Sequence, residues 1–423
     1  MPTPRLARVL GIVAACAMGA GALAGCGGSS SSNGTTTITF MEAMASGTLK
    51  TSMVHLTDEF EKSHPKIKVN LEAYPDYGTL HNKETAAVAA QKPPTIGQVY
   101  EDWAATYASS DVIVPLDSYA TSGDLSALYP SVRDDLYLPG HKLYMWPFNK
   151  SVVIQYYNSN MLKAKGLAAP KTWDEFATTA KKVSGNGVTA VAIDPGNSAG
   201  PAGGEAWYEI LSSAYGTPVF AANGSPQFTG TGAVKAMQYL VDLKKAGALT
   251  LGKNYPGQVA LGAAKGAFDV SSVASYYYDK QAVGTKFTMG TAPLPSGPSG
   301  AANQMAGTNI VMFAKASDAE RKAAWTYLKY LTSASSQAYW STNSGYLPVT
   351  PAALPKMTNA ASYLTFAADA LKTAKADPPY GWITVCQGDL AVAMQSALTG
   401  KQSASAALAD AQKQCESAKS SNQ

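Results

Sequence analysis

Acidic and aromatic side chains recur in this sequence where predicted strands end. Alternating apolar residues predict strands over 36–41, 67–71 and 95–100, and acidic or aromatic residues follow each of them. In a parallel α/β sheet such strand ends meet at one edge, where ligands bind. The residues in question are Glu42, Tyr77, Glu101 and Trp103. Carboxylates bond paired hydroxyls and flat rings pack against the apolar face of a pyranose, so this set predicts a sugar site.

The rest of the chain supplies further side chains of the same kinds. Core packing is the alternative role for each aromatic residue among them, because buried rings are common in any fold of this size. The added aromatic candidates are Trp146, Trp207, Tyr346 and Trp382, and the added polar candidates are Asp102, Asn149 and Glu205.

Catalysis is not expected from these residues. Glu101 and Asp102 are adjacent, and neighbours in a strand point to opposite faces, so they cannot act as the paired carboxylates of a glycosidase. No Ser-His-Asp order or phosphate-cradling loop occurs, and the four histidines lack metal-ligand spacing. The sequence therefore predicts a binding protein with no catalytic residue, no metal and no cofactor.

The elements that must position these side chains are those of an α/β protein. Between the strands 36–41 and 67–71, apolar residues at helical spacing predict a helix that ends before Pro65, which makes a parallel crossover unit. A chain of 423 residues is too long for one ordinary core, so we expect two domains. A net charge of +4, without a run of basic residues, argues against a nucleic-acid partner.

The N-terminus predicts export and a membrane anchor. Residues 1–25 combine two arginines with a short apolar stretch and are typical of a signal peptide. The run Leu23-Ala24-Gly25-Cys26 resembles a bacterial lipobox, in which Cys26 becomes the lipidated first residue, and an ordinary secretory signal is the alternative. The Gly- and Ser-rich residues 26–36 predict a flexible tether. We therefore expect a lipid-anchored protein on the extracellular face of the cell membrane.

Two cysteines remain in the mature chain besides the proposed lipid site. They are Cys386 and Cys415, because Cys16 lies in the leader. In an oxidising exterior we expect these two to form a disulfide, with two separate buried thiols as the alternative.

Three motifs in order carry a resemblance to a known family. Residues 142–162 contain Pro147-Phe148-Asn149 followed by a strand-like run ending Tyr156-Tyr157-Asn158, and Pro170-Lys171-Thr172-Trp173-Asp174-Glu175 comes next. This order resembles bacterial extracellular solute-binding proteins of ABC importers, family 1, a group that includes carbohydrate- and glycerol-phosphate-binding lipoproteins. The resemblance implies a two-lobe periplasmic-binding-protein-like fold of type II, α/β in class. Mixed central sheets would be flanked by helices, with the ligand cleft between the lobes.

The resemblance also implies a division of the chain and a set of ligand residues. Lobe 1 would comprise 37–147 plus 270–332, and lobe 2 would comprise 148–269 plus 333–418, with the strand leaving one lobe near Pro147. The resemblance is closest to the branch that binds glycerol phosphate and glycerophosphodiesters. The residues shared with that branch are Tyr77, Glu101, Ser151, Ser272, Gly307 and Tyr346.

One departure from that branch bears on the ligand. The branch uses an arginine near the C-terminal region to hold phosphate, whereas this chain has Trp382 there and keeps only Arg133 and Arg321 after the leader. Arginine is the side chain best suited to phosphate. We therefore expect a neutral oligosaccharide, delivered by a monomer to an ABC permease, and keep glycerol 3-phosphate or a glycerophosphodiester as the alternative.

Overall fold

The computed structural model describes residues 34–196, 204–358 and 360–422. The predicted signal peptide, the lipidation site Cys26 and most of the tether lie outside these ranges. Across the described ranges no helix combines the length and apolar character that a membrane crossing needs.

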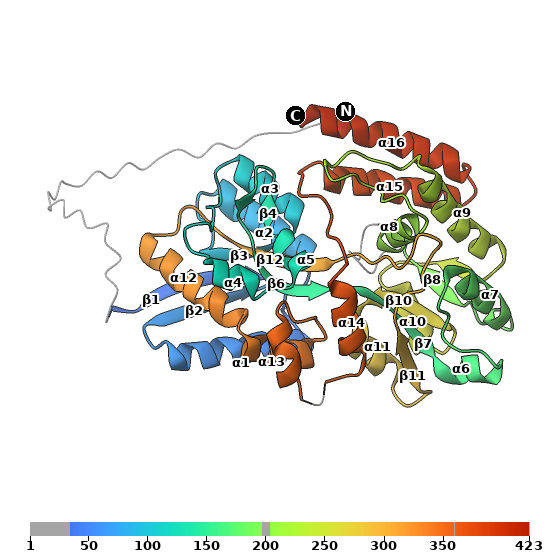
Figure 1. The fold of residues 1–423 in the computed structure, drawn as a ribbon, viewed down its shortest axis with the longest axis horizontal. Coiled ribbons are helices and arrows are strands. Elements are labelled where there is room, and N and C mark those ends of the chain that lie inside the picture. The colour runs from blue at the N-terminus through green and yellow to red at the C-terminus, as the bar shows by residue number, and fades with distance from the viewer. Residues whose placement is uncertain (1–33, 197–203, 359, 423) are drawn as a thin grey trace, which may run out of the picture.

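Two separate hydrophobic cores organise the molecule. The first core is built around Phe40, Ile310 and Tyr327, and the second around Phe176, Tyr208 and Leu240. In Figure 1 the blue and orange elements of the first core lie on the left, and the green and red elements of the second lie on the right. The α/β class and the two lobes expected from the sequence are therefore present.

A five-stranded mixed sheet forms the centre of the first core. Strands β1, β2 and β3 are parallel to one another, while β12 runs antiparallel to both β3 and β6. The strand order is β2 (Ile67–Ala73), β1 (Thr36–Glu42), β3 (Ile96–Val99), β12 (Ala306–Met312) and β6 (Trp146–Ser151). The helices of this part are α1 (Gly47–Ser63), α2 (Tyr77–Ala89), α3 (Glu101–Ser109), α4 (Ser122–Ser126), α5 (Pro130–Asp134), α12 (Asp318–Leu331), α13 (Ala334–Ser344) and α14 (Tyr363–Leu371), with the 3-10 segment η4 (Pro351–Lys356).

Smaller sheets support the second core. An antiparallel sheet has the order β10 (Phe268–Ser272), β7 (Val153–Asn158) and β11 (Met289–Ala292), and β8 (Val191–Ile193) pairs in parallel with β9 (Leu249–Leu251). The helices are α6 (Ser159–Ala164), α7 (Trp173–Val183), α8 (Gly204–Ala214), α9 (Thr231–Lys245), α15 (Ile383–Leu398) and α16 (Ala404–Ser421). Between the cores lie α10 (Pro256–Gly262), the 3-10 segment η3 (Val273–Ser275) and α11 (Tyr276–Val283), and the hairpin of β4 (Tyr137–Leu138) and β5 (Lys142–Leu143) flanks the large sheet.

The chain passes from the large sheet to the smaller antiparallel sheet between β6 and β7. Strand β6 ends at Ser151, and β7 begins in the other sheet at Val153. Pro147 lacks an amide proton and lies on an edge strand, where that loss is tolerated. The pairing register of β6 with β12 shifts there, because Asn309 pairs with Pro147 and Thr308 with Asn149. The ladder between β6 and β12 is therefore irregular beside Pro147.

The core packing suggests a boundary between the lobes. The predicted division gave 333–418 to lobe 2, whereas residues of α13 and α14 pack in the first core and those of α15 and α16 pack in the second. The division stays a prediction, and we propose that the last boundary between the lobes lies at 375–382 instead of between 332 and 333.

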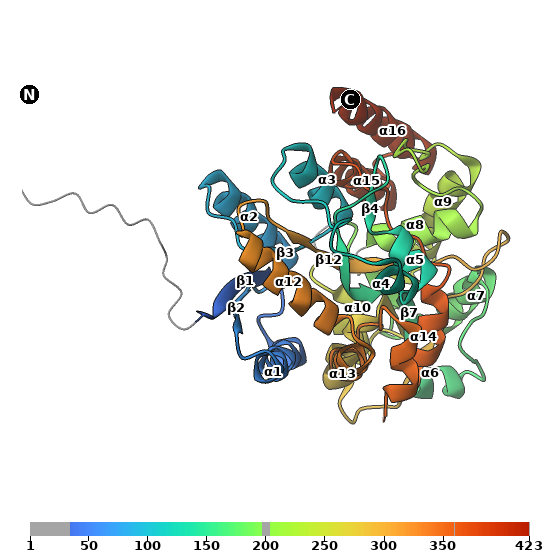
Figure 2. The ribbon, with the colours of Figure 1, turned by 60° about the vertical axis from the view of Figure 1, so that its left-hand side comes forward.

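The predicted disulfide is present between Cys386 on α15 and Cys415 on α16. Figure 2 shows α16 lying along the outer side of α15. The disulfide therefore fixes the terminal helix to the helix beneath it.

Candidate functional site

A cavity of about 720 Å³ lies between the two cores. Residues from α3 and from the ends of β6 and β12 line one side, and residues from α8 and α15 line the other. This volume is in the range typical of small-molecule sites. The candidates from the sequence that lie on its wall are Tyr77, Glu101, Asp102, Trp103, Ser151, Glu205, Ser272, Gly307 and Tyr346.

Two tyrosines form the centre of the wall on the side of the first core. The hydroxyls of Tyr77 and Tyr346 lie 3.1 Å apart, so one donates to the other. Burial raises the pKa of both phenols, which therefore stay protonated, so the phenol that accepts within the pair keeps its own proton to donate to a ligand. The pair supplies hydroxyl groups together with flat apolar rings.

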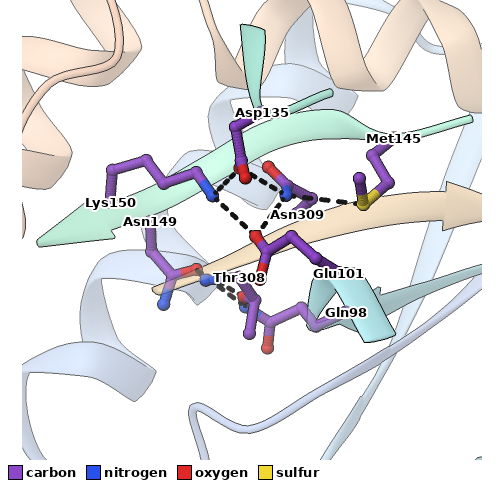
Figure 3. Close-up of polar contacts among 8 residues, drawn as sticks. All are labelled: Gln98, Glu101, Asp135, Met145, Asn149, Lys150, Thr308 and Asn309. Atoms are coloured by element: carbon purple, nitrogen blue, oxygen red, sulfur yellow. Dashed lines mark hydrogen bonds and ion pairs between the residues drawn. The ribbon is translucent and has the colours of Figure 1, made fainter. Parts of the chain in front are cut away.

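Asn149 holds this tyrosine pair in place from behind the wall. Its Nδ2 donates to the Tyr77 hydroxyl at 2.8 Å, and its Oδ1 accepts from the Thr308 amide at 3.1 Å. Gln98 continues the network by donating to Thr308 Oγ1 at 3.0 Å (Figure 3). Asn149 is fully buried and does not line the cavity, so it acts as a positioning residue.

Trp103 contributes a large aromatic surface near the start of α3. Its indole stacks on the His81 ring at a centroid distance of 4.0 Å and an interplanar angle of 6°. Tyr100 meets it edge-on at 5.1 Å. The three rings brace one another, so the tryptophan is held rigidly at the cavity.

Glu101 is tied to a buried ion network. Lys150 Nζ lies 2.6 Å from Asp135 Oδ2 and 3.3 Å from Glu101 Oε1, and Asn309 Nδ2 donates to both acids at 3.0 Å. Figure 3 shows the ammonium between the two carboxyl groups. Burial and the Asp135 charge raise the pKa of Glu101, while Lys150 opposes this rise. The network locks Glu101 at the cavity wall.

Backbone proximity explains the glycine at position 307. Its φ is +96°, and a Cβ there would lie 1.7 Å from the carbonyl oxygen of Asn149. Any side chain would therefore push β12 away from β6. Ser151 and Ser272 also line the cavity. The Oγ of Ser272 accepts from the Ala274 amide at 3.2 Å. The Ser272 hydroxyl thus also caps η3.

Two buried glutamates and a half-buried aspartate form the opposite wall. Glu205 and Glu209 lie one turn apart on α8, and Asp377 follows α14. Gln304 Nε2 donates to Glu209 Oε2 at 2.9 Å, and Gln387 Nε2 donates to Asp377 Oδ2 at 2.8 Å. Burial raises the pKa of Asp377 to about 6, and burial together with the Asp377 charge raises the pKa of Glu205 and Glu209. We call Glu205, Glu209 and Asp377 the acid trio.

One hydrogen bond joins the two sides of the cavity. The Thr384 hydroxyl on α15 donates to the Asp102 carboxylate on α3. Glu101 and Asp102, which we expected in a strand, both open helix α3. They therefore do not point to opposite faces of a strand, and each acid instead contacts its own partner.

Three predicted tryptophans belong to the cores. Trp207 packs among Trp173 and Phe176 at centroid distances of 6.0 and 5.7 Å. Trp382 stacks on Tyr380 at 4.4 Å, and its Nε1 donates to the Gly224 carbonyl at 3.0 Å. Trp146 likewise donates to Thr332 Oγ1 at 3.1 Å. The expectation of a Trp382 stacking face in the cavity is corrected, because its ring closes the second core.

Glu42 also lies off the cavity wall. It is buried, its carboxylate accepts from the Met44 amide, and burial raises its pKa to about 7. Several wall residues were not singled out from the sequence. They are His81, Glu209, Tyr255, Tyr278, Gln304, Asp377 and Gln387. The spacing of Glu209 one helical turn after Glu205 is the signal that could have found it.

Two α/β lobes with a cavity enclosed by both define the architecture of two-lobe periplasmic binding proteins. Solved structures of that class are similar to this chain. The GacH receptor of Streptomyces glaucescens aligns at a TM-score of 0.79 and 20% identity, covering 92% of this chain and 100% of that one. UgpB from Mycobacterium tuberculosis, in complex with glycerophosphocholine, aligns at a TM-score of 0.81 and 19% identity, covering 92% and 99%.

Residues 55–373 match the family model of bacterial extracellular solute-binding proteins, and the chain belongs to that family. Among its relatives is the sn-glycerol-3-phosphate-binding periplasmic protein UgpB of Yersinia enterocolitica, 30% identical over 359 residues and 75% of each chain. The protein of the same name from Rhizobium meliloti is 27% identical over 317 residues, which is 70% of this chain and 72% of the relative. The family resemblance inferred from the sequence motifs is confirmed.

Proposed function

We propose that this protein captures a carbohydrate for an ABC importer and that the ligand carries no phosphate. One observation carries the choice: within the described ranges, no lysine or arginine lines the cavity, whereas six acidic residues do. The ammonium of Lys150, which contacts the cavity residue Glu101, is already paired with two acids. The wall instead offers phenols, an indole and carboxylates, which suit sugar rings and their hydroxyls.

A phosphate ester is the second candidate, because relatives are named for binding glycerol 3-phosphate and one structural neighbour holds glycerophosphocholine. A phosphate in this cavity would face carboxylates and rely on backbone amides alone. The cavity is also large for glycerol 3-phosphate. Both points favour an oligosaccharide.

Release to a permease would follow hinge opening at the crossovers. The Asp102–Thr384 hydrogen bond spans the cavity, so it contributes to the closed arrangement. The closed lobes would present one combined surface to the membrane subunits.

Trp103→Ala should weaken sugar binding about tenfold to hundredfold, because the loss of one aromatic stacking surface costs on the order of 1–3 kcal/mol. Trp382→Ala is the matched control: the same substitution at a buried tryptophan outside the cavity. It should lower the melting temperature and leave the affinity per folded molecule within a factor of about three.

Calorimetry against neutral oligosaccharides, glycerol 3-phosphate and glycerophosphocholine tests the function itself. Ligand binding to the folded state must also raise the melting temperature by mass action. Tight binding of a phosphate ester with no response to any sugar would refute the carbohydrate proposal.

We further propose lipid anchoring through Cys26, supported by the lipobox-like run and the Gly/Ser tether. In cells, Cys26→Ala should shift the protein from the membrane fraction to the soluble fraction, because its acyl chains supply the attachment. Membrane retention of the mutant, with mass spectrometry showing no lipid, would contradict the anchor.

A further inference from the structure

The acidic wall of the cavity is only partly satisfied by the protein. Five of the six lining acids accept from or pair with a protein group. Asp76 accepts from the Thr79 amide at 2.7 Å, Glu101 contacts Lys150, and Asp102 accepts from Thr384. Within the acid trio, Glu209 accepts from Gln304 and Asp377 from Gln387, which leaves Glu205 on the side of the second core.

Glu205 is the least satisfied member of the acid trio. It is 5% exposed, it lines the cavity, and its Oε1 is buried without a hydrogen-bond partner. The amides of Gln304 and Gln387 serve Glu209 and Asp377. An unpartnered buried carboxylate oxygen costs free energy, so its donor is expected from outside the protein.

The basic side chains in the described ranges do not fill that role. Across the part of the chain that the structure describes, no ion pair involves the acid trio. Residues 197–203, which precede α8, read Asn-Ser-Ala-Gly-Pro-Ala-Gly and contain no lysine, arginine or histidine. A metal ion is not indicated, because the described residues contain no group of three or more acids, histidines or cysteines arranged to hold one.

We propose that the ligand is an amino sugar, with its protonated primary amine bound by the acid trio. This rests on the carbohydrate function proposed above and specifies the class of sugar. A primary ammonium brings a positive charge and three N–H donors to three carboxyl groups. A trimethylammonium group has no N–H donor and would leave Glu205 Oε1 unpaired. The rings of Tyr77, Tyr346 and Trp103 would hold the sugar on the opposite side.

Matched sugar pairs that differ in one group test the proposal. Calorimetry would compare glucosamine with glucose, galactosamine with galactose, and β-1,4-linked glucosamine oligomers with cello-oligosaccharides. The wild type should bind the amino member about tenfold or more tightly than the hydroxyl member, as expected for a charge-assisted contact. Glu205→Gln keeps the shape and removes the charge, and should reduce this ratio to within about threefold.

Glu42→Gln is the matched control, because Glu42 is also a buried glutamate but lies off the cavity wall. It should leave the ratio of affinities for the amino and hydroxyl sugars unchanged. Melting temperatures establish that both variants are folded. Loss of the ratio in Glu42→Gln, or equal weakening of both sugars in Glu205→Gln, would overturn the proposal.

The outcomes separate the amino-sugar proposal from the carbohydrate function on which it rests. If a neutral sugar binds as tightly as its amino counterpart, the carbohydrate function stands and the amino-sugar proposal is overturned. If glycerophosphocholine binds and no sugar does, or if nothing in the panel binds, both are overturned.

Discussion

Replacing Lys150 by methionine is expected to lower the free energy of unfolding by about 3–5 kcal/mol near neutral pH. Lys150 is fully buried, and its ammonium lies between Asp135 and Glu101. Methionine keeps most of the volume but leaves two buried acids without their cation. Urea titration of the purified domain measures the difference.

The pH dependence of this loss has a defined sign. Burial and Asp135 raise the pKa of Glu101, and removing Lys150 lets it rise further. The folded mutant then binds a proton that the unfolded chain releases, so its stability falls as the pH rises above the ordinary carboxyl pKa. The loss should therefore be smaller at about pH 5 than at about pH 8.

Lys329→Met provides the comparison, because Lys329 forms a 2.8 Å ion pair with Asp124 and its side chain is 47% exposed. That change should cost less than about 1 kcal/mol. Equal effects of the two substitutions would show that the Lys150 network does not stabilise the fold.

Removing the disulfide with Cys386→Ala and Cys415→Ala should cost about 3–4 kcal/mol, because the bond closes a loop of sequence separation 29. Chemical denaturation of the double mutant measures the loss. Wild-type protein that is unfolded and refolded under reducing conditions should lose a similar amount of its free energy of unfolding.

Thiol labelling of the unfolded, unreduced wild type is the direct check. In a wild-type domain that begins after Cys26, the labelling should find no free thiol. Two labelled thiols, or a double mutant as stable as the wild type, would contradict a stabilising disulfide.

Local sequence signals predicted the fold well. The β1–α1–β2 unit followed from apolar spacing and from Pro65, because these signals act over a few residues. The pairing of Cys386 with Cys415 followed from counting cysteines and from the expected oxidising exterior.

The site was predicted only in part, because the sequence does not show which way an aromatic ring faces. Trp103 and Trp382 both follow plausible strand or loop ends, yet one lines the cavity and the other closes the second core. The contact between Gln304 and Glu209 joins residues 95 positions apart, and no local pattern encodes such a meeting. These distant contacts make up the acid trio and its surroundings.

The cavity divides its chemistry between the lobes, and this has a kinetic consequence. Aromatic rings lie on the wall formed by the first core, and the unpartnered carboxyl oxygen of Glu205 lies on the wall formed by α8. An open molecule would present each wall separately, so the association rate of the ligand depends on one wall. The dissociation rate instead depends on both walls being closed around the ligand. A permease that parts the lobes would speed dissociation without altering either wall, and cargo would be released by separation alone.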